Sequence, residues 1–534
     1  MFGLAGGNPL NAAENEKLLI EVVQRTVDKW CRDPKTTEEA LFDTIYHERR
    51  RLEGEKKKSV AKRDRALYDR SYHQGLKASA GTQREIFRQI IQRFANEVVG
   101  HFDPRVYALS TRVIPVAMNL LLNSVSPLRL VETLQGANSL IDQLDLEGQT
   151  HSLKRLARQA TIVLVPTHSS NLDSIMIGFG LYRLGLPPFT YGAGLNLFSN
   201  RLVGFFMHNL GAYKVDRRKQ AAVYKDVLKT YAGCSMEMGF HNLFFPGGTR
   251  SRSGAVESSL KRGLLGMGLD AYVNNLRAKA KKPDVFIVPC TINYQLVLEA
   301  ETLIADHLKA QGKSRFIIED DEFSKPRRVF EFIKQLFSLH SRIHLMFGQA
   351  LDVFGNQVDD QGVSHDQRGR PVDRTRYVLD SSGQPAVDAQ RDREYTRELA
   401  RSISESYHQN TVIKSTNLVS RAVFDLLKEH NPDLDLFRLL RTGGAEESFS
   451  LQEVYGRIER TLTTARALAQ QGQLKLDKTL AGKDTVAVAS EALAHLGSYH
   501  RKPALERRGD RLFHQDRKLL LFYQNRLSGF AWEG

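Results

Sequence analysis

The chain has 534 residues, of which 41% are apolar and 26% are charged, and its formal net charge is +15. A chain of this length has room for two or three domains, and its composition is that of an ordinary soluble globular protein. Its three widely spaced cysteines, Cys31, Cys234 and Cys290, match no metal-binding spacing and indicate a reducing compartment.

No segment has the length and apolarity of a transmembrane helix. The longest uncharged stretch, residues 113–128, is interrupted by Pro115 and several polar residues, so we expect no membrane span. The N-terminus has no basic region before an apolar one, so we expect no signal peptide. The positive charge predicts attraction to an anionic lipid surface, a nucleic acid or an acidic carrier protein, without choosing among them.

Residues 1–135 are predicted to form a helical N-terminal region. Thr36-Thr37-Glu38-Glu39 has the capping-box pattern of a helix start. A basic run over residues 49–65 fits either a solvated helix face or a membrane contact. Apolar residues recur at helical spacing over residues 106–130, which fits a helix packed on a sheet or one lying in a membrane interface.

Residues 136–354 alternate between strand-like and helix-like patterns. This alternation predicts an α/β domain, in which a mixed sheet is flanked by helices. Pro289 is expected to break the strand in which it falls. The predicted strands are 161–166, near 211–215, 243–246, 285–289 and 343–347, and the predicted helices are 172–184, 219–231, 259–276 and 326–340.

The last third of the chain is predicted to contain a polar linker and a second helical region. Residues 355–390 are rich in Gly, Asp, Gln and Arg, without an apolar period, and we expect a long loop or linker. Residues 391–534 are expected to form a helical C-terminal domain that closes with an apolar helix around 519–523. We find no internal repeat.

A histidine and an aspartate follow the most strand-like run of the chain. The run Thr161–Pro166 predicts a buried strand, and the helix after it places His168 at the carboxyl edge of the sheet and Asp173 in the first helical turn. A neutral imidazole can remove a proton from a hydroxyl group, and a nearby carboxylate can orient the ring. The alternative is a turn histidine beside a carboxylate that favours the helix start.

Arginines and glycines follow other predicted strands of the same domain. Arg217 comes directly after one strand, and a loop with Arg250 and Arg252 comes after another. Arginine binds phosphate with two hydrogen bonds, and glycine lets the backbone approach a ligand closely. Together with His168 at one sheet edge, these residues predict a phosphorylated substrate whose hydroxyl group loses a proton. Taken singly, the arginines also fit surface charge, and Pro289 fits a strand terminator.

These four stretches together resemble the four motifs of the glycerolipid acyltransferases. The resemblance is greatest to the large glycerol-3-phosphate acyltransferases and their dihydroxyacetone-phosphate relatives. The segment from His168 to Asp173 resembles the H-x-x-x-x-D motif, and Gly211–Arg217 resembles the second motif. Phe245–Gly254 resembles F-P-E-G-T-R-S-R-S-G, and Val288–Tyr294 resembles the final motif. The resemblance is specific over residues 161–350 and weak elsewhere.

The resemblance implies transfer of an acyl group from acyl-CoA or acyl-carrier protein to the 1-hydroxyl of glycerol 3-phosphate. The reaction would need no metal or cofactor, and the lack of a G-x-S-x-G nucleophile elbow argues against an acyl-enzyme. His168 would be the general base and Asp173 its orienting partner. The implied substrate-binding residues are Arg217, Gly248, Thr249, Arg250 and Arg252 for the phosphate, and Pro289 for the acyl donor.

One position departs from the family pattern, because Gly247 stands where the third motif has glutamate. This departure keeps two alternatives open: acylation of a lysophospholipid such as 1-acylglycerol 3-phosphate, or a catalytically weak protein that binds lipid or carrier. A nucleic-acid-binding C-terminal region is a third alternative, but it lacks a basic stripe with interleaved aromatics, so we expect no nucleic-acid partner. The expected location is peripheral, on the cytoplasmic face of the inner membrane, against anionic lipid.

Overall fold

The computed structural model describes residues 11–54, 58–109, 143–198, 201–311, 341–444, 447–530 and 532, with residues 325, 327–329, 331–332, 335 and 339. Most of the apolar stretch 106–130 and much of the predicted helix 326–340 lie outside these residues. Within the part of the chain that the structure describes, no helix combines the length and apolarity needed to cross a bilayer.

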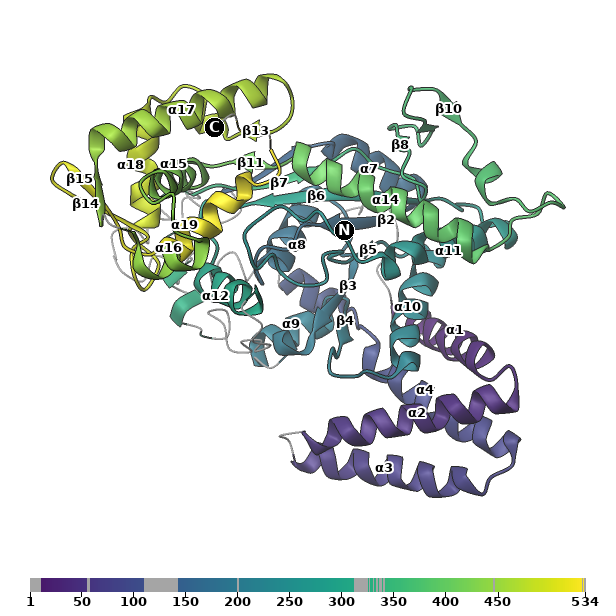
Figure 1. Ribbon diagram of the computed structural model, residues 1–534. Coiled ribbons are helices and arrows are strands. Elements are labelled where there is room, and N and C mark those ends of the chain that lie inside the picture. The colour runs from purple at the N-terminus through teal and green to yellow at the C-terminus, as the bar shows by residue number, and fades with distance from the viewer. Residues whose placement is uncertain are drawn as a thin grey trace.

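A mixed sheet forms the centre of the molecule, which confirms the predicted α/β class (Figure 1). The five strands β6, β2, β5, β3 and β4 run parallel to one another, whereas β7 pairs antiparallel with β6 and parallel with β1. The strand order is β1 (Leu144–Gly148), β7 (Ile343–Phe347), β6 (Val285–Asn293), β2 (Thr161–Pro166), β5 (Asn242–Leu243), β3 (Thr190–Gly194) and β4 (Ala212–Val215).

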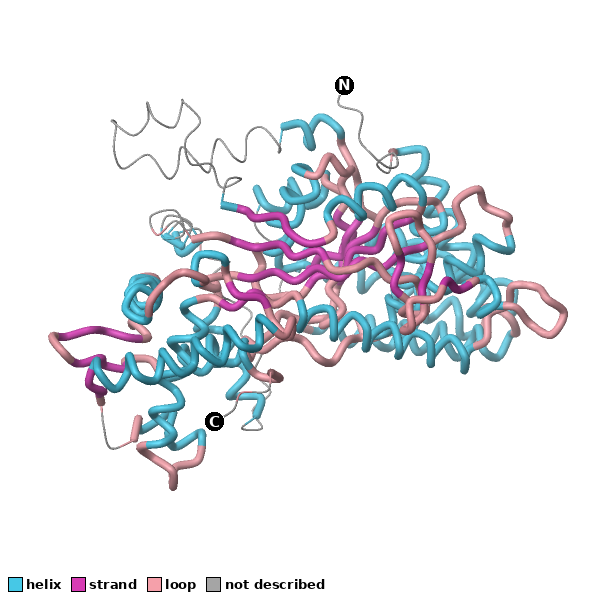
Figure 2. Tube along the Cα trace, turned by 90° about the horizontal axis from the view of Figure 1, so that it is seen from above, coloured by secondary structure: helices cyan, strands magenta, loops and turns pink. Residues whose placement is uncertain are grey.

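Helices cover both faces of the sheet (Figure 2). Alternate side chains of β2 enter different cores, because successive residues of a strand point to opposite faces. Ile162 and Leu164 pack with α7 (Thr150–Gln159) and α8 (Asp173–Arg183). Val163 and Val165 pack on the other face with α10 (Ala222–Glu237), α11 (Arg262–Arg277) and α14 (Ala389–Gln409). The strand β2 is therefore buried throughout, and its carboxyl end is held rigidly.

The expected break of the strand at Pro289 is wrong. Strand β6 continues through Pro289, which pairs with Val165 of β2, and its carbonyl accepts the Gly348 N–H at 2.8 Å. From Cys290 onwards, the same strand pairs antiparallel with β7. Pro289 thus lies where β6 stops pairing with β2 along one edge and starts pairing with β7 along the other. The loss of its backbone N–H donor costs little there. Strand β5 is shorter than predicted, because the chain turns away from the sheet after Leu243.

Six elements that the structure describes in the α/β domain escaped the sequence patterns, namely β1, α7, β3, η2 (Leu195–Phe198), α9 (Arg201–Asn209) and α12 (Ala300–Gln311). Strand β1 lies at the sheet edge and alternates apolar and acidic residues, so it has no continuous apolar run. Strand β3 reads Thr-Tyr-Gly-Ala-Gly, and its glycines resemble a turn rather than a strand. Both strands are specified by their neighbours in the sheet more than by their own composition. The short helices η2 (Leu195–Phe198) and α9 (Arg201–Asn209) follow β3.

The N-terminal region is helical, as predicted. Its helices are α1 (Ala12–Trp30), α2 (Pro34–Glu53), α3 (Lys58–Leu76) and α4 (Ala80–Val98), and their core continues into β4 and α10. The capping box expected at Thr36–Glu39 is wrong, because α2 begins earlier. Asp33 caps the helix by accepting the Thr36 N–H at 2.9 Å, and Pro34 occupies the first turn, where its missing N–H is not needed.

A buried lysine joins this helical region to the α/β domain. The Lys219 ammonium, whose side chain is 4% exposed, lies 2.7 Å from Glu48 and 3.0 Å from Glu97. It also lies over the ring of Phe94, 4.5 Å from the ring centroid. Glu48 in turn pairs with Arg51, so part of the basic run 49–65 serves internal ion pairs rather than a solvated face.

The segment 355–390 contains a repeated turn, so the expectation of no internal repeat is wrong. Asp352, Asp359, Asp366 and Asp380 each accept the backbone N–H groups two and four residues further on. A glycine with positive φ follows each aspartate three residues later. The repeat escapes a sequence reading because it consists of turn residues without apolar period. The associated short elements are β8 (Gln357–Val358), β9 (Ser364–His365), β10 (Pro371–Val372) and η4 (Arg374–Val378).

The C-terminal region is mostly helical, as predicted, and it also contains a small antiparallel sheet. The helices are α15 (Ser415–Glu429), α16 (Leu436–Thr442), α17 (Leu451–Gln470), α18 (Thr485–Leu496) and α19 (Arg517–Gln524), with α12 (Ala300–Gln311) of the α/β domain against α19. The small sheet is β12 (Ser448–Ser450), β15 (Arg511–His514) and β14 (Leu505–Arg508); β11 (Val412–Ile413) pairs with β13 (Lys475–Leu476), and η5 (Lys478–Leu480) and η6 (Asn525–Leu527) complete the region.

Replacing Lys219 by methionine tests the junction between the N-terminal helices and the α/β domain. The variant keeps the packing on Phe94 but leaves two carboxylates without their shared cation, so we expect a loss of about 3 kcal/mol in the free energy of unfolding. Denaturant-induced unfolding measures this quantity. Lys225→Met, at an exposed position of α10, serves as the control and should change it by less than about 0.5 kcal/mol. Equal effects of the two substitutions would contradict the structural role of Lys219.

Candidate active site

The Asp173 carboxylate is the most strongly held group at the carboxyl edge of the sheet. It is fully buried at the start of α8, and its Oδ2 lies 2.9 Å from His168 Nδ1. The same oxygen accepts the backbone N–H groups of Ser169 and Ser170 at 2.7 and 2.9 Å. The Tyr294 hydroxyl donates to Oδ1 at 2.7 Å. Four donors thus satisfy one buried carboxylate.

The surroundings of the His168 ring set both its orientation and its protonation state. It stacks on Phe245 with 4.0 Å between ring centroids and an interplanar angle of 22°. Burial lowers the pKa of His168, Asp173 raises it, and Arg250 and Arg217 lower it further, with a net shift below the ordinary value. The ring is therefore neutral near pH 7. Because Nδ1 faces the carboxylate, it carries the proton, and Nε2 is left as the basic nitrogen.

The backbone of His168 is held from both sides by the loop that follows β5. Its N–H donates to Glu257 Oε1 at 3.1 Å, and its carbonyl accepts the Ser251 N–H at 2.7 Å. The residue is 15% exposed at its side chain, so the imidazole remains accessible while its main chain is fixed. The turn after β2 and the loop after β5 thus form one hydrogen-bonded unit.

Two guanidinium groups, those of Arg217 and Arg250, lie close enough to His168 to lower its pKa, and Arg252 lies near Arg217. Arg217 follows β4 and is exposed, and its Nη2 donates to the Gly248 carbonyl at 2.7 Å. Partial burial lowers the pKa of Arg217, and the positive charges of Arg250 and Arg252 lower it further. The neighbouring positive charges of these arginines repel one another, so the cluster favours an anionic ligand that would neutralise it.

Glu299 connects the histidine turn to the arginine cluster. It is fully buried and lies 3.3 Å from Arg250, while its two oxygens accept the Ser170 hydroxyl at 2.8 Å and the Asn171 N–H at 3.1 Å. Glu299, Tyr294 and Glu257 were not predicted from the sequence as site residues. A charged residue inside the apolar run Leu296–Ala300 is the signal that could have found Glu299, because a buried carboxylate needs a partner.

The remaining predicted residues occupy two different environments. Gly248 and Thr249 lie in the loop after β5 with Arg250 and Arg252, and Gly248 has φ +77°, a conformation that glycine adopts without strain. Pro289 instead lies buried within β6 and pairs with the penultimate residue of β2. The structure therefore gathers His168, Asp173 and the loop residues at one edge, and it places Pro289 in the sheet beneath them. A part for Pro289 in the donor site stays a prediction.

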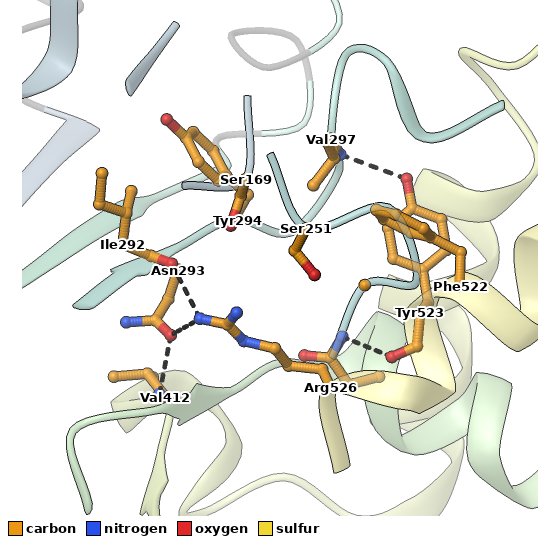
Figure 3. Close-up of a pocket in the computed structure, with 12 residues that line it drawn as sticks. Ser169, Ser251, Ile292, Asn293, Tyr294, Val297, Val412, Phe522, Tyr523 and Arg526 are labelled. Atoms are coloured by element: carbon orange, nitrogen blue, oxygen red, sulfur yellow. Dashed lines mark hydrogen bonds between the residues drawn. The ribbon is translucent and has the colours of Figure 1, made fainter. Parts of the chain in front are cut away.

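Residues of α19 and η6 line a small pocket next to the histidine turn, where Figure 3 shows Phe522, Tyr523 and Arg526 around Ser169, Ser251 and Asn293. Asn525 donates to the Ser253 carbonyl at 3.0 Å, and Arg526 donates to the Ile292 carbonyl and to Asn293 Oδ1 at 2.9 and 3.0 Å. A cavity of about 30 Å³ remains between these segments, bounded by Ser169, Ser251, Asn293, Tyr523 and Arg526 among others. This volume is that of one or two water molecules.

One group of side chains could in principle hold a metal ion, away from the histidine. Asp145, Glu147 and His344 offer ligand atoms within 4.8 Å of one another on β1 and β7. However, Arg342 lies 2.7 Å from Asp145, and Lys478 lies 3.2 Å from Glu147. These cations already balance the carboxylates, so we assign the group to the ion-pair network between the α/β domain and the C-terminal region.

Comparison with known proteins adds a family to this geometry. Residues 148–293 match the family model described as Acyltransferase. The chain carries an acyltransferase domain. The match spans β2, the histidine turn, the arginine-bearing loops and β6, so the matched range contains the candidate site except Tyr294, Glu299 and the C-terminal contacts.

Three relatives of the acyltransferase domain show the breadth of the similarity. A glycerol-3-phosphate acyltransferase from Pseudomonas fluorescens strain Pf0-1 is 28% identical over 41% of this chain and 24% of its own length. One from Pseudomonas entomophila is 25% identical over 49% and 28%, and a dihydroxyacetone phosphate acyltransferase from Bos taurus is 29% identical over 39% and 28%. These matches confirm the resemblance found in the motifs, and they span about a quarter of the length of the relatives.

A pH-dependent stability difference tests the environment of Glu257. Burial raises the pKa of this carboxyl group to about 8, and Asp173 raises it further, whereas the His168 N–H and the charge of Arg526 lower it. In the unfolded chain, its pKa is about 4.3. Between these two values, only the unfolded chain releases the proton, so the contribution of Glu257 to folding stability falls as pH rises across this window and is constant above it.

Glu257→Gln removes this titration and should therefore unfold at a higher temperature than the wild type at pH 8.5. At pH 4.5 the difference in melting temperature should be much smaller. The difference in melting temperature between the two proteins removes the contributions of titrating groups other than Glu257. The groups of this kind that face Glu257 are Asp173, Arg526, His168 and Tyr407. Melting curves from pH 4.5 to 8.5 provide the measurement. Parallel curves for the two proteins would show that the carboxyl group is ionised in the folded state.

Proposed function

We propose that this protein is a glycerol-3-phosphate O-acyltransferase that takes a fatty acyl group from acyl-CoA or acyl-carrier protein. The observation that carries the proposal is the His168–Asp173 pair at the carboxyl edge of the sheet, with a neutral, accessible imidazole near the guanidinium groups of Arg217 and Arg250. The names of the relatives support the acceptor, since they acylate glycerol 3-phosphate or dihydroxyacetone phosphate.

In the proposed mechanism, His168 is the general base. Its Nε2 takes the proton from the 1-hydroxyl of the acceptor while the hydroxyl oxygen attacks the thioester carbonyl. The resulting tetrahedral intermediate collapses, the carbon–sulfur bond breaks, and the thiolate leaves with the proton returned by the imidazolium. Asp173 stabilises the imidazolium and holds its orientation, and it keeps its own charge because four donors surround it.

The arginine cluster would bind the phosphate of the acceptor. Arg217 is exposed, whereas Arg250 is 18% exposed at its side chain and is held by Glu299, so the two present guanidinium groups of different mobility. Arginine suits this task because its planar group donates two parallel hydrogen bonds to phosphate oxygens. An acceptor such as 1-acylglycerol 3-phosphate carries the same phosphate and a free hydroxyl, so the assay below includes it.

We also propose a peripheral contact with an anionic membrane. Three exposed apolar side chains, Leu109, Tyr182 and Phe205, are 47, 40 and 49% exposed. They belong to adjoining elements. The ring of Tyr107 contacts the ring of Tyr182, and the backbone N–H groups of His101 and Asp103 donate to the carbonyls of His208 and Asn209 at the end of α9. Apolar side chains on a protein of net charge +15 suit the headgroup boundary of an anionic lipid surface.

Acyl transfer to radiolabelled glycerol 3-phosphate tests the proposed activity directly. Wild-type protein should form product with acyl-CoA, acyl-carrier protein or both, and His168→Ala should lower kcat by at least about 10³-fold because the base is lost. His365→Ala, in the turn segment, is the control and should leave the rate unchanged. Product only with 1-acylglycerol 3-phosphate would reassign the acceptor. Full activity of His168→Ala would refute the mechanism.

The pH dependence of kcat/KM should show an acid limb. The imidazole must be neutral to act as a base, so kcat/KM rises with pH through the pKa of His168 in the free protein, which lies below its ordinary value of about 6.5, and is level at pH 7. Asp173→Asn removes the carboxylate that raises this pKa, so the limb should move to lower pH while the level falls by about 10³- to 10⁴-fold. A limb at the same pH in both proteins would belong to another group, such as the substrate phosphate.

Replacing Phe205 by serine tests the membrane contact. We expect weaker cosedimentation of the variant with vesicles that contain anionic phospholipid, because an apolar side chain no longer enters the headgroup boundary. Phe437→Ser is a matched control, since Phe437 is also 49% exposed but lies on α16 of the C-terminal region. Equal binding by both variants would contradict the contact at α9. Retention on heparin without binding to vesicles would point to nucleic acid instead.

A further inference from the structure

Gly247 and Glu257 share one space in the loop after β5. A Cβ atom added to Gly247 would lie 2.7 Å from Glu257 Oε1 and 2.8 Å from its Cδ. Such short distances require one of the two groups to shift, so a side chain at position 247 would displace the carboxyl group of Glu257 from its present place. The carboxyl group thus occupies the space into which a side chain at position 247 would extend.

The backbone at position 247 does not itself require glycine. Gly248 and Gly254 have φ values of +77° and +84°, which strain any other residue, whereas Gly247 has no positive φ. At Gly254, moreover, an added Cβ would collide with the carbonyl of Phe522, which cannot move freely. At Gly247 the obstacle is only the carboxyl end of one side chain. Removing that side chain would therefore make room for another residue at position 247.

The carboxyl group of Glu257 is held in place and directed at the histidine turn. The loop returns towards its start, where the Lys261 N–H donates to the Pro246 carbonyl at 2.7 Å, and the Ser404 hydroxyl of α14 donates to the Glu257 carbonyl at 3.3 Å. Oε1 accepts the His168 N–H, while Oε2 is buried and has no hydrogen-bond partner among the residues that the structure describes.

We propose that Glu257 supplies to this loop the carboxyl group that the residue at position 247 lacks, and that it acts as a positioning residue for His168. Its Oε1 anchors the first residue of the histidine turn, and through that residue it sets the direction of the imidazole. The small residue Gly247 and the carboxyl group of Glu257 thus belong together: Glu257, at the far end of the loop, places its carboxyl group where a side chain at position 247 would lie. The assignment of this role rests on the proposed acyltransferase function.

Two substitutions at Glu257 separate positioning from mere packing. Glu257→Leu keeps the bulk but cannot accept the His168 N–H, so kcat should fall by about 10²-fold with little change in the KM for glycerol 3-phosphate. Glu257→Gln keeps a carbonyl acceptor of the same shape and should retain most of the wild-type kcat. Glu405→Leu, at an exposed position of α14 next to Ser404, controls for loss of an acidic side chain.

A carboxyl group moved from position 257 to position 247 provides the decisive test. Gly247→Glu alone should lower both kcat and the melting temperature, because two carboxyl groups would compete for one space. The double variant Gly247→Glu/Glu257→Ala removes the obstacle and should recover most of both losses. Kinetics and thermal unfolding of the single and double variants give the coupling between the two positions.

The outcomes distinguish this inference from the proposed function. Wild-type kcat in Glu257→Leu, or a double variant no better than Gly247→Glu in either measurement, would overturn the inference while leaving the function intact. A wild-type protein that transfers no acyl group to either acceptor would overturn the function. In that case, recovery of the melting temperature in the double variant would still establish the shared space. Should Glu257→Leu fail to fold, Glu257→Gln and the double variant still decide.

Discussion

A single buried negative charge organises the candidate site. The Asp173 carboxylate has no contact with solvent, and such a charge is tolerated only where donors replace the water that it has lost. Two backbone N–H groups of the turn, the His168 ring and the Tyr294 hydroxyl provide that replacement. The demand for these donors bends the chain sharply after β2, and the bend brings the imidazole over the sheet edge. The orientation of the ring is thus a consequence of satisfying the charge.

A second buried carboxylate extends this arrangement to the arginines. Glu299 takes donors from the same turn and also pairs with Arg250, so the histidine and the cationic loop share one electrostatic support. The three segments that meet here come from the ends of β2, β5 and β6. Parallel neighbours place their carboxyl ends at one edge, which is why residues far apart in the chain can act on one ligand.

The sequence predicted those parts of the site that depend on local pattern. Thr161–Pro166 is a β-branched run buried on both faces, and the residues after it follow from strand, turn and helix start. Arg217 and Arg250 could be placed in the same way, because each follows the end of a strand, β4 and β5 respectively. Glu299, Tyr294 and Glu257 were not found as site residues, because each acts through a hydrogen bond to a residue distant in sequence. The same limit explains the missed strands β1 and β3, which depend on pairing partners.

The continuous strand β6 shows how tertiary context overrides a local rule. A proline in a central strand normally removes a hydrogen bond from the ladder. Pro289 lies where one edge of β6 pairs with β2 and the other begins to pair with β7, so its carbonyl remains useful and its missing donor is not needed. The lack of a side chain at position 247 is similarly explained only by the carboxyl group of Glu257, ten residues along the chain.

The two halves of the site also differ in how far the chain must travel to build them. His168 and Asp173 are five residues apart, and their pairing needs only the strand and helix on either side. Lys219, two residues after Arg217, instead reaches Glu48 across 171 residues. Closing so long a loop costs entropy before any contact is gained, so contacts of this kind form late in folding. The Lys219 contact is therefore expected to form after the histidine turn, which can assemble with the first strands of the sheet.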